Sequence, residues 1–284
     1  MPPLSGVSHR LWGIGRSTLR IPGLRPFLIC ISLGALLVLA LARASQSAER
    51  EGCGLLEKYP HTSAFTLSTG ARIALPTQAA AVDSYALLGW LDPDATDRYL
   101  APFGLHGLHL QDGVLAALSV YDYRRSDFGP FREAYFALVA TGRGGKIALF
   151  HLAAWSDSPV GALASAELWG IPSRLARVEA TDSTDFQVTA NVGPVFTMHW
   201  ATAPFHDNPV GHSLRIAAVG ETGRWSPVEA CGPRAYRNYD AARDRLTVRD
   251  PRLLGLMKDL DFRPAYLETA RGQEAVQFPP DPAD

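Results

Sequence analysis

Short segments in which apolar residues alternate with polar or small ones recur along the chain beyond Thr62. Alternation of this kind is typical of strands that bury one face, and glycine or proline between two such segments is typical of a turn. The pattern predicts strands at residues 64–68, 71–75, 85–91, 114–123, 133–141, 146–155, 174–179, 186–192, 195–201, 213–219 and 228–230. The sequence therefore indicates a mainly β domain of the α+β class.

Helix signals occur between these strands. Helices are predicted at residues 92–100, 158–169 and 251–260, because acidic or Ser-Pro starts are followed there by apolar residues at helical spacing. Gly170 ends the second of them, and Pro172 prevents its continuation. This junction is expected to present Ser173 and Arg174 at the start of the next strand, where side chains can reach a central cavity.

The N-terminal segment has the composition of a targeting element. Several arginines precede an uncharged apolar run at residues 26–42, which is just long enough to insert into a membrane. Ala42-Arg43-Ala44 favours a cleaved signal peptide, whereas the long basic leader favours an uncleaved anchor, and both alternatives stay open. We expect a leader at residues 1–48, a domain at 49–276 and a disordered tail at 277–284. The domain is expected to be exported, either periplasmic or extracellular, or anchored to the inner membrane.

Composition excludes several classes of function. The net charge is −1 over 284 residues, so the chain lacks the basic excess that nucleic-acid binding requires. The glycine-rich residues 142–145 have neither the dinucleotide nor the phosphate-loop spacing, so no cofactor is expected. The eight histidines form no metal-binding motif, and we expect no metal site.

Cysteines outside the apolar run number two, Cys53 and Cys231. An even number in an exported domain permits one disulfide. The alternative is two unpaired thiols, one in a loop and one buried, because sequence alone does not give their separation.

Two motifs point to a family. Gly129-Pro130-Phe131-Arg132-Glu133 is followed by Glu167-Leu168-Trp169-Gly170-Ile171-Pro172, and this ordered pair resembles the acetoacetate decarboxylase superfamily. The resemblance extends over about residues 84–271. It implies a curved antiparallel sheet that closes into a barrel or cone, with a few covering helices and an internal cavity. It also implies that the cavity is lined by Phe131, Glu133, Trp169, Pro172, Ser173 and Arg174.

The resemblance fails where the family places its nucleophile. A Lys-Lys pair follows the proline in the family, and its first amine forms a Schiff base with a β-keto acid. Ser173 and Arg174 occupy these positions here, and neither serine nor a permanently protonated guanidinium forms an imine. Two further family arginines have no counterpart, which argues against carboxylate substrates bound in the family manner.

Two functional hypotheses follow. The first is a pocket protein, in effect a pseudoenzyme without Schiff-base decarboxylase activity, that binds a small apolar or keto-type ligand outside the cytoplasm. The second is a lyase-type enzyme that acts on a keto compound with Glu133 or Glu167 as acid–base residue. We favour the first, because the turn, Glu133 and Pro172 are retained while the Schiff-base position is empty, and the second remains the alternative. The partners expected are a small-molecule ligand and, through residues 26–42, a membrane.

Overall fold

The fold is known from a computed structural model, which describes residues 53–208 and 213–280. The predicted basic leader, apolar segment and cleavage site lie outside these residues, as does the end of the predicted tail. Within the described part of the chain, no helix has the length and apolar character needed to cross a bilayer.

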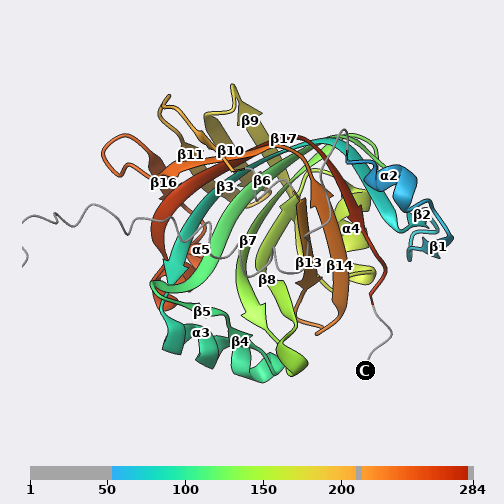
Figure 1. Ribbon diagram of the computed structural model, residues 1–284, viewed down its shortest axis with the longest axis horizontal. Helices are drawn as coiled ribbons and strands as arrows, with labels where there is room; N and C mark the ends of the chain where they lie inside the picture. Colours follow the sequence, from blue (N-terminus) through green and yellow to red (C-terminus); the bar gives the residue numbers. More distant parts are fainter. Residues whose placement is uncertain (1–52, 209–212, 281–284) are drawn as a thin grey trace, which may run out of the picture.

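A ring of strands closes on itself and forms the body of the domain (Figure 1). In ring order its strands are β3 (Thr77–Leu91), β6 (Gly113–Ser126), β7 (Phe131–Thr141), β8 (Ile147–Ser156), β13 (Ser213–Val219), β14 (Trp225–Cys231) and β17 (Arg263–Gln277). The ring closes because β8 pairs with β7 on one edge and with β13 on the other. This closed, mainly β architecture confirms the predicted fold class.

Strand β8 is forked along its second edge. Ala148–Phe150 pair with β13, whereas Ala154–Ser156 pair with β9 (Ser173–Thr181). Both pairings are parallel, so the sheet is mixed and not wholly antiparallel as predicted. The reason is that α4 carries the chain back across the sheet between β8 and β9, and such a crossover produces parallel neighbours.

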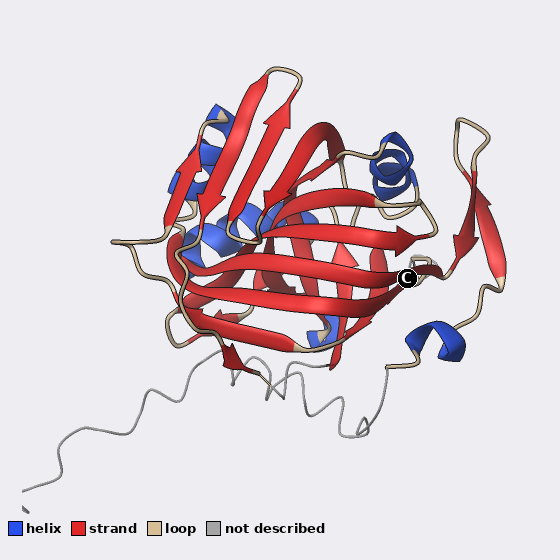
Figure 2. Cartoon of the chain, turned by 90° about the horizontal axis from the view of Figure 1, so that it is seen from above, coloured by secondary structure: helices blue, strands red, loops and turns tan. Residues whose placement is uncertain are grey.

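Four strands leave the ring at this fork and form a wing, visible in two orientations (Figures 1 and 2). The wing runs in the order β9, β10 (Asp185–Ala190), β11 (Gly193–His199) and β16 (Arg245–Val248). One face of the wing is apolar and includes Val178, Phe186 and Met198, which belong to the same buried cluster as Ala134, Phe136 and Leu138 of β7. The wing therefore packs against the ring through this shared cluster.

Three helices begin where capping chemistry predicts. Helices α3 (Pro93–Leu100), α4 (Pro159–Glu167) and α5 (Pro251–Asp259) each have proline in the first turn. The side chains of Asp92, Ser158 and Asp250 cap them by accepting hydrogen bonds from backbone N–H groups. The predicted helix positions are thus confirmed.

The remaining elements are short. They are α2 (Leu55–Lys58), β1 (Ser63–Thr66), β2 (Arg72–Leu75), β4 (His106–Gly107), β5 (His109–Leu110), β12 (His206–Asp207), β15 (Arg234–Asn238) and the 3₁₀ turns η1 (Ala101–Phe103) and η2 (Arg143–Gly145). Strands β1 and β2 form the hairpin predicted around Thr69-Gly70. Strand β15 pairs with the first half of β17, while β14 pairs with the second half.

The structure differs from the predicted strands mainly in β3 and β17. Strand β3 begins at Thr77 instead of residue 85, and β17 was not predicted. The two pair with each other along most of their length. At the far end, Gln277 pairs with Val228, so the ordered chain continues past the predicted domain limit at residue 276.

A disulfide joins Cys53 to Cys231, with 5.8 Å between their Cα atoms. This is the pairing that the sequence left open. Beside it, the Leu55 backbone N–H donates to Glu274 at 2.7 Å, which holds the start of α2 against β17. The segment that precedes the first hairpin is therefore fixed to two strands of the ring.

Candidate functional site

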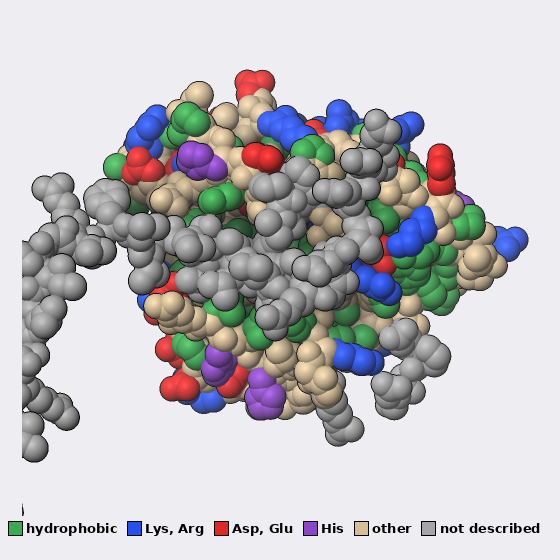
Figure 3. Space-filling view, in the orientation of Figure 1, with side chains coloured by type: hydrophobic (Ala, Val, Ile, Leu, Met, Phe, Trp, Pro, Cys, Tyr) green, Lys and Arg blue, Asp and Glu red, His purple; other side chains and the backbone are tan. Residues whose placement is uncertain are grey.

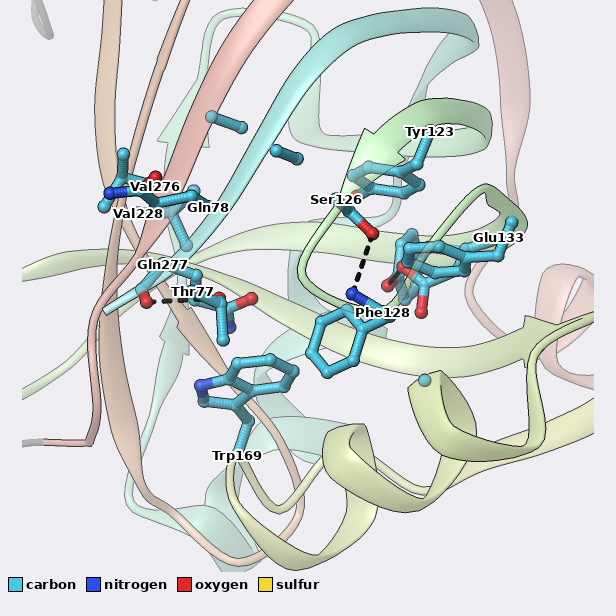
Figure 4. Close-up of a pocket in the computed structure, with 15 residues that line it drawn as sticks. Thr77, Gln78, Tyr123, Ser126, Phe128, Glu133, Trp169, Val228, Val276 and Gln277 are labelled. Carbon is cyan, nitrogen blue, oxygen red and sulfur yellow. Dashed lines mark hydrogen bonds between the residues drawn. The ribbon is translucent and has the colours of Figure 1, made fainter. Parts of the chain in front are cut away.

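A small cavity of about 80 Å³ lies inside the ring, next to the C-terminal end of α4 (Figure 4). Its walls come from β3, β6, β7, β14, β17 and the α4 region. The lining residues are Thr77, Gln78, Ala79, Tyr123, Ser126, Phe128, Phe131, Glu133, Tyr135, Gly161, Trp169, Val228, Ala275, Val276 and Gln277. Glu133 is the only carboxylate among them.

Glu133 is 4% exposed and comes from β7. The Tyr135 hydroxyl, two residues further along the same strand, donates a hydrogen bond to Glu133 Oε2. Residues i and i+2 of a strand project from the same face, so the local sequence alone brings these two groups together. Figure 4 shows Glu133 beside Tyr123, on the side of the cavity opposite Val228 and Val276.

Burial decides the ionisation of this group. Loss of solvation raises the pKa of Glu133 to about 7, and the hydrogen bond from Tyr135 only partly offsets that effect. Burial likewise raises the pKa of the Tyr135 phenol well above its usual range, so Tyr135 stays protonated and acts as a donor. Glu133 is therefore a carboxyl that can give or take a proton near neutral pH.

Aromatic rings enclose the carboxyl. Tyr123 stacks on Phe131 with 4.5 Å between centroids, and Phe128 lies edge-on to Phe131 and to Trp169. Tyr121 lies edge-on to Tyr135 at 5.7 Å. These contacts exclude water from the neighbourhood of Glu133, which is the physical origin of its raised pKa.

A second compartment of about 120 Å³ adjoins the first and shares Tyr123, Tyr135 and Trp169 as walls. It adds polar groups that the first lacks, among them His151 from β8, Arg234 from β15 and Gln273 from β17. Burial lowers the pKa of His151 to about 4, so its imidazole is neutral at physiological pH.

The predicted pocket residues separate into two groups. Phe131, Glu133 and Trp169 line the first cavity, whereas Pro172 and Arg174 are exposed at the surface and line neither compartment. Ser173 is intermediate, because it is partly buried but belongs to neither wall.

The strand register nevertheless relates Ser173 to the site. Ser173 pairs with Ala154 of β8, and Ala154 pairs with Tyr135 of β7. Directly paired residues project from the same face of a sheet, so Ser173 belongs to the row of Tyr135. Its Oγ is buried and has no hydrogen-bond partner among the described residues. Arg174, the next residue, projects from the opposite face and is exposed.

The turn before Ser173 requires glycine. Gly170 has φ of 68°, and a Cβ built on it would lie 1.8 Å from Thr222 Oγ1. A side chain at position 170 would therefore be both strained and obstructed. This fixes the path of the chain from α4 into β9.

The position of Glu167 differs from the position expected of an acid–base residue. Its carboxylate accepts hydrogen bonds from the backbone N–H of Ser68, at 2.8 Å, and from the Ser68 hydroxyl. Its backbone carbonyl accepts from Arg224. Glu167 lines neither compartment and connects α4 to the β1–β2 hairpin, because it lies on the side of α4 that faces this hairpin.

The chain's three lysines lie away from both compartments. Lys58, Lys146 and Lys258 are exposed, in α2, before β8 and in α5 respectively. Among the described residues, no group of three or more His, Cys, Asp and Glu side chains is arranged to hold a metal ion. On the face seen in Figure 3, acidic and basic side chains are interspersed.

Sequence reasoning missed His151, Arg234 and Gln273. His151 is a histidine within an apolar strand, which is a weak signal for a functional site. Gln273 follows Arg271-Gly272, and this pair indicates a β-bulge only once β17 is recognised as a strand. Arg234 follows Gly232-Pro233, which reads locally as a turn.

Comparisons with known proteins agree with this architecture. Residues 89–209 match the family model described as acetoacetate decarboxylase (ADC). The crystal structure of acetoacetate decarboxylase from Legionella pneumophila subsp. pneumophila str. Philadelphia 1 is similar over 87% of this chain and 96% of that chain, with a TM-score of 0.53 and 14% identity. The enduracididine biosynthesis enzyme MppR with HEPES bound is similar over 72% and 86%, with a TM-score of 0.50 and 16% identity. No curated protein sequence matches the chain.

The closed ring is a β-barrel with an internal, partly aromatic cavity. Phe131 and Glu133 of the first motif and Trp169 of the second line that cavity, and all three lie within the segment that the family model matches. Over residues 89–209 the chain matches the acetoacetate decarboxylase family model, and its fold is similar to that of acetoacetate decarboxylase.

Proposed function

We propose that the chain binds a small, uncharged keto-type compound in the barrel and does not form a Schiff base with it. The observation that carries this proposal is the composition of the cavity wall, where Glu133 is the one carboxylate and lysine is absent. Below pH 7 the Glu133 carboxyl is largely protonated and can donate a hydrogen bond to a carbonyl oxygen.

The cavity dimensions support a ligand of a few heavy atoms. The compartments measure about 80 and 120 Å³, and an apolar cavity of about 150 Å³ holds a molecule the size of benzene. Tyr123, Phe131 and Trp169 offer apolar surface for an alkyl chain. An anionic ligand is disfavoured beside Glu133, because a second negative charge in a desolvated space is costly.

The raised pKa of Glu133 favours a second candidate function, proton transfer at the carbon next to a ketone. A general base is most effective when its pKa lies near the working pH. Glu133 as carboxylate would accept the α-proton and return it to the same carbon, and Tyr135 would stabilise the carboxylate by its hydrogen bond. This reaction needs neither lysine nor metal.

The expected location outside the cytoplasm is part of the proposal. The Cys53–Cys231 bridge supports it, because disulfides persist in oxidising compartments. The membrane contact through residues 26–42 is proposed on composition alone.

Ligand-observed NMR of the full chain with 2-pentanone tests the binding function. Wild type and Glu167→Gln are expected to bind the ketone equally, whereas Glu133→Gln, which loses the acidic donor, should bind about tenfold more weakly. Glu167 is the matched control because it belongs to the same sequence motif but lies outside the cavity. Unchanged affinity in Glu133→Gln would contradict the proposal.

Two further measurements separate the candidates. Borohydride with 2-pentanone should add no covalent mass to the wild-type chain, and mass gained at a lysine would reveal a Schiff base. Exchange of the ketone α-protons in D₂O should accelerate as the pH rises through 7, and should fall by about 10²-fold or more in Glu133→Gln, if the chain is an enzyme. Binding without exchange identifies a pocket protein.

A further inference from the structure

The second compartment contains a polar side chain placed there by an irregularity in β17. Ala270 pairs with Ser84 and Gln273 pairs with Val82, so Arg271 and Gly272 together oppose Asp83. The extra residue forms a β-bulge, and bulges re-aim side chains next to functional sites. Gly272 adopts φ of 58° within it.

The bulge is fixed by polar contacts on its outer side. Asp83 Oδ1 accepts hydrogen bonds from the Gly272 backbone N–H at 2.8 Å and from Arg124 Nη2 at 2.9 Å. On the inner side, the Ser84 hydroxyl donates to Gln273 Oε1 at 3.3 Å. Gln273 is 2% exposed and lines the second compartment. Its position is therefore determined from both sides of the strand.

Buried donors at this compartment lack partners. Gln273 Nε2, Arg234 Nε and Trp169 Nε1 are buried and form no hydrogen bond with any described residue. All three residues line the compartment. A buried N–H without an acceptor costs about 1–3 kcal/mol, so three of them in one small space favour an occupant that supplies acceptors.

The charge of this region is already balanced. Arg234 Nη1 binds Glu268 Oε1 at 2.8 Å, and both side chains are at least four-fifths buried. The guanidinium charge is thus compensated, and its Nε–H remains as a donor. An acceptor without charge fits this balance better than a carboxylate, which would leave one negative charge in excess.

We propose that Arg234, Gln273 and Trp169 form a second polar subsite, which binds an uncharged carbonyl group of the same ligand that Glu133 contacts. The inference rests on the proposed function and deepens it, because it makes the ligand bifunctional. The substrate class is a compact dicarbonyl compound, such as a keto ester, keto amide or diketone.

The two subsites are close enough for one small molecule. Their compartments share Tyr123, Tyr135 and Trp169 as walls. The Tyr121 phenol is within electrostatic range of both Glu133 and Arg234. A ligand with its two carbonyl groups separated by one or two carbons therefore suits the site.

Affinity measurements with matched probes test the subsite. Methyl acetoacetate has two uncharged carbonyl groups, 2-pentanone has one, and acetoacetate replaces the ester by a carboxylate. The wild-type chain is expected to bind methyl acetoacetate at least tenfold more tightly than either other probe. Gln273→Met should remove most of this advantage and change the affinity for 2-pentanone less than twofold. Gln187→Met, an exposed position in the wing, is the matched control and should change neither.

A second variant, Arg234→Lys, tests the subsite if Gln273→Met does not fold. Arg234→Lys can keep the ion pair with Glu268 but removes the Nε–H donor, so it should reduce the preference for methyl acetoacetate in the same way. Equal affinities for the two uncharged probes, unaffected by both variants, would overturn the subsite while the proposed function stands. Tighter binding of acetoacetate than of its ester would also overturn it, because the subsite would then be an anion site. Failure of every probe to bind would overturn the proposed function and this inference with it.

Discussion

The ionisation of Glu133 should make the stability of the fold depend on pH in a characteristic way. Burial raises its pKa from the ordinary 4.5 to about 7. Each tenfold change in proton affinity corresponds to about 1.4 kcal/mol, so the fold favours the protonated over the ionised carboxyl by about 3 kcal/mol.

The sign follows from which state holds the proton. Below about pH 4.5 the carboxyl is protonated in both the folded and the unfolded chain, and the stabilisation is fully present. As the pH rises toward about 7, the unfolded chain releases the proton while the fold retains it, so the free energy of unfolding falls. Above about pH 7 the Glu133 carboxyl is ionised in the folded chain as well, and the stabilisation is completely lost.

Glu133→Gln removes the titration but keeps the shape and an oxygen that can accept the Tyr135 hydrogen bond. The variant and the wild type should differ by less than about 1 kcal/mol at pH 4.5, and the variant should be more stable by about 3 kcal/mol at pH 8. Urea unfolding with the disulfide intact, compared at several pH values, measures the difference.

Glu221→Gln provides the control, since Glu221 is an exposed residue of the turn between β13 and β14. Its substitution should change the stability by less than about 0.5 kcal/mol throughout this range. A difference between Glu133→Gln and wild type that stays constant from pH 4.5 to pH 8 would refute the reasoning, because Glu133 would then have an ordinary pKa in the fold.

Three further predictions concern other parts of the molecule. The double change Ser173→Lys, Arg174→Lys should allow a keto acid to be trapped as an imine by borohydride at position 173, and mass spectrometry that finds no adduct would separate Ser173 from the site. Cys231→Ser should lower the free energy of unfolding by about 2–5 kcal/mol in urea, and an unchanged midpoint under oxidising conditions would contradict this. Glu167→Ala should loosen the β1–β2 hairpin, measured as faster amide exchange there, at a cost of about 1–3 kcal/mol; equal exchange rates would show that the hairpin does not depend on this carboxylate.

Local chemistry made much of the fold predictable from the sequence. Asp92 and Ser158 accept hydrogen bonds from the first turns of the helices they begin, and such caps are readable without tertiary information. Side chains project alternately from the two faces of each strand in the ring. For the same reason Glu133 and Tyr135, two residues apart in one strand, could be expected on a common face.

The second compartment could not be predicted in this way. His151, Arg234 and Gln273 come from three strands that are remote in sequence, and only the closure of the ring brings them together. Strand β17 escaped prediction because many of its residues are polar and its bulge interrupts the alternation, while its pairing with β3 stabilises it over a long distance in sequence. Tertiary contacts, and not propensity, determine that strand.

The fork in β8 explains why the family motif predicted Ser173 and Arg174 poorly. The motif implies that the chain enters the cavity wall directly after Pro172. In the structure, β9 leaves the ring at this point, so only its first residues pair with β8, and Arg174 is exposed. A sequence pattern gives the order of elements, but the edge that a strand joins is decided by packing.

The covalent bond between Cys53 and Cys231 also determines how the molecule would respond to mechanical force. The bridge closes a loop with a sequence separation of 178, which contains every ring strand except β17. Tension applied to the chain before Cys53 and at the C-terminal end passes through the sulfur atoms and bypasses this loop. About 600 Å of contour length, at about 3.4 Å per residue, is thus withheld from extension while the bond is intact. Only β15, β16, α5 and β17 lie on the loaded path, so β17, which carries Gln273, would be pulled from the barrel before the Glu133 strand experiences any load.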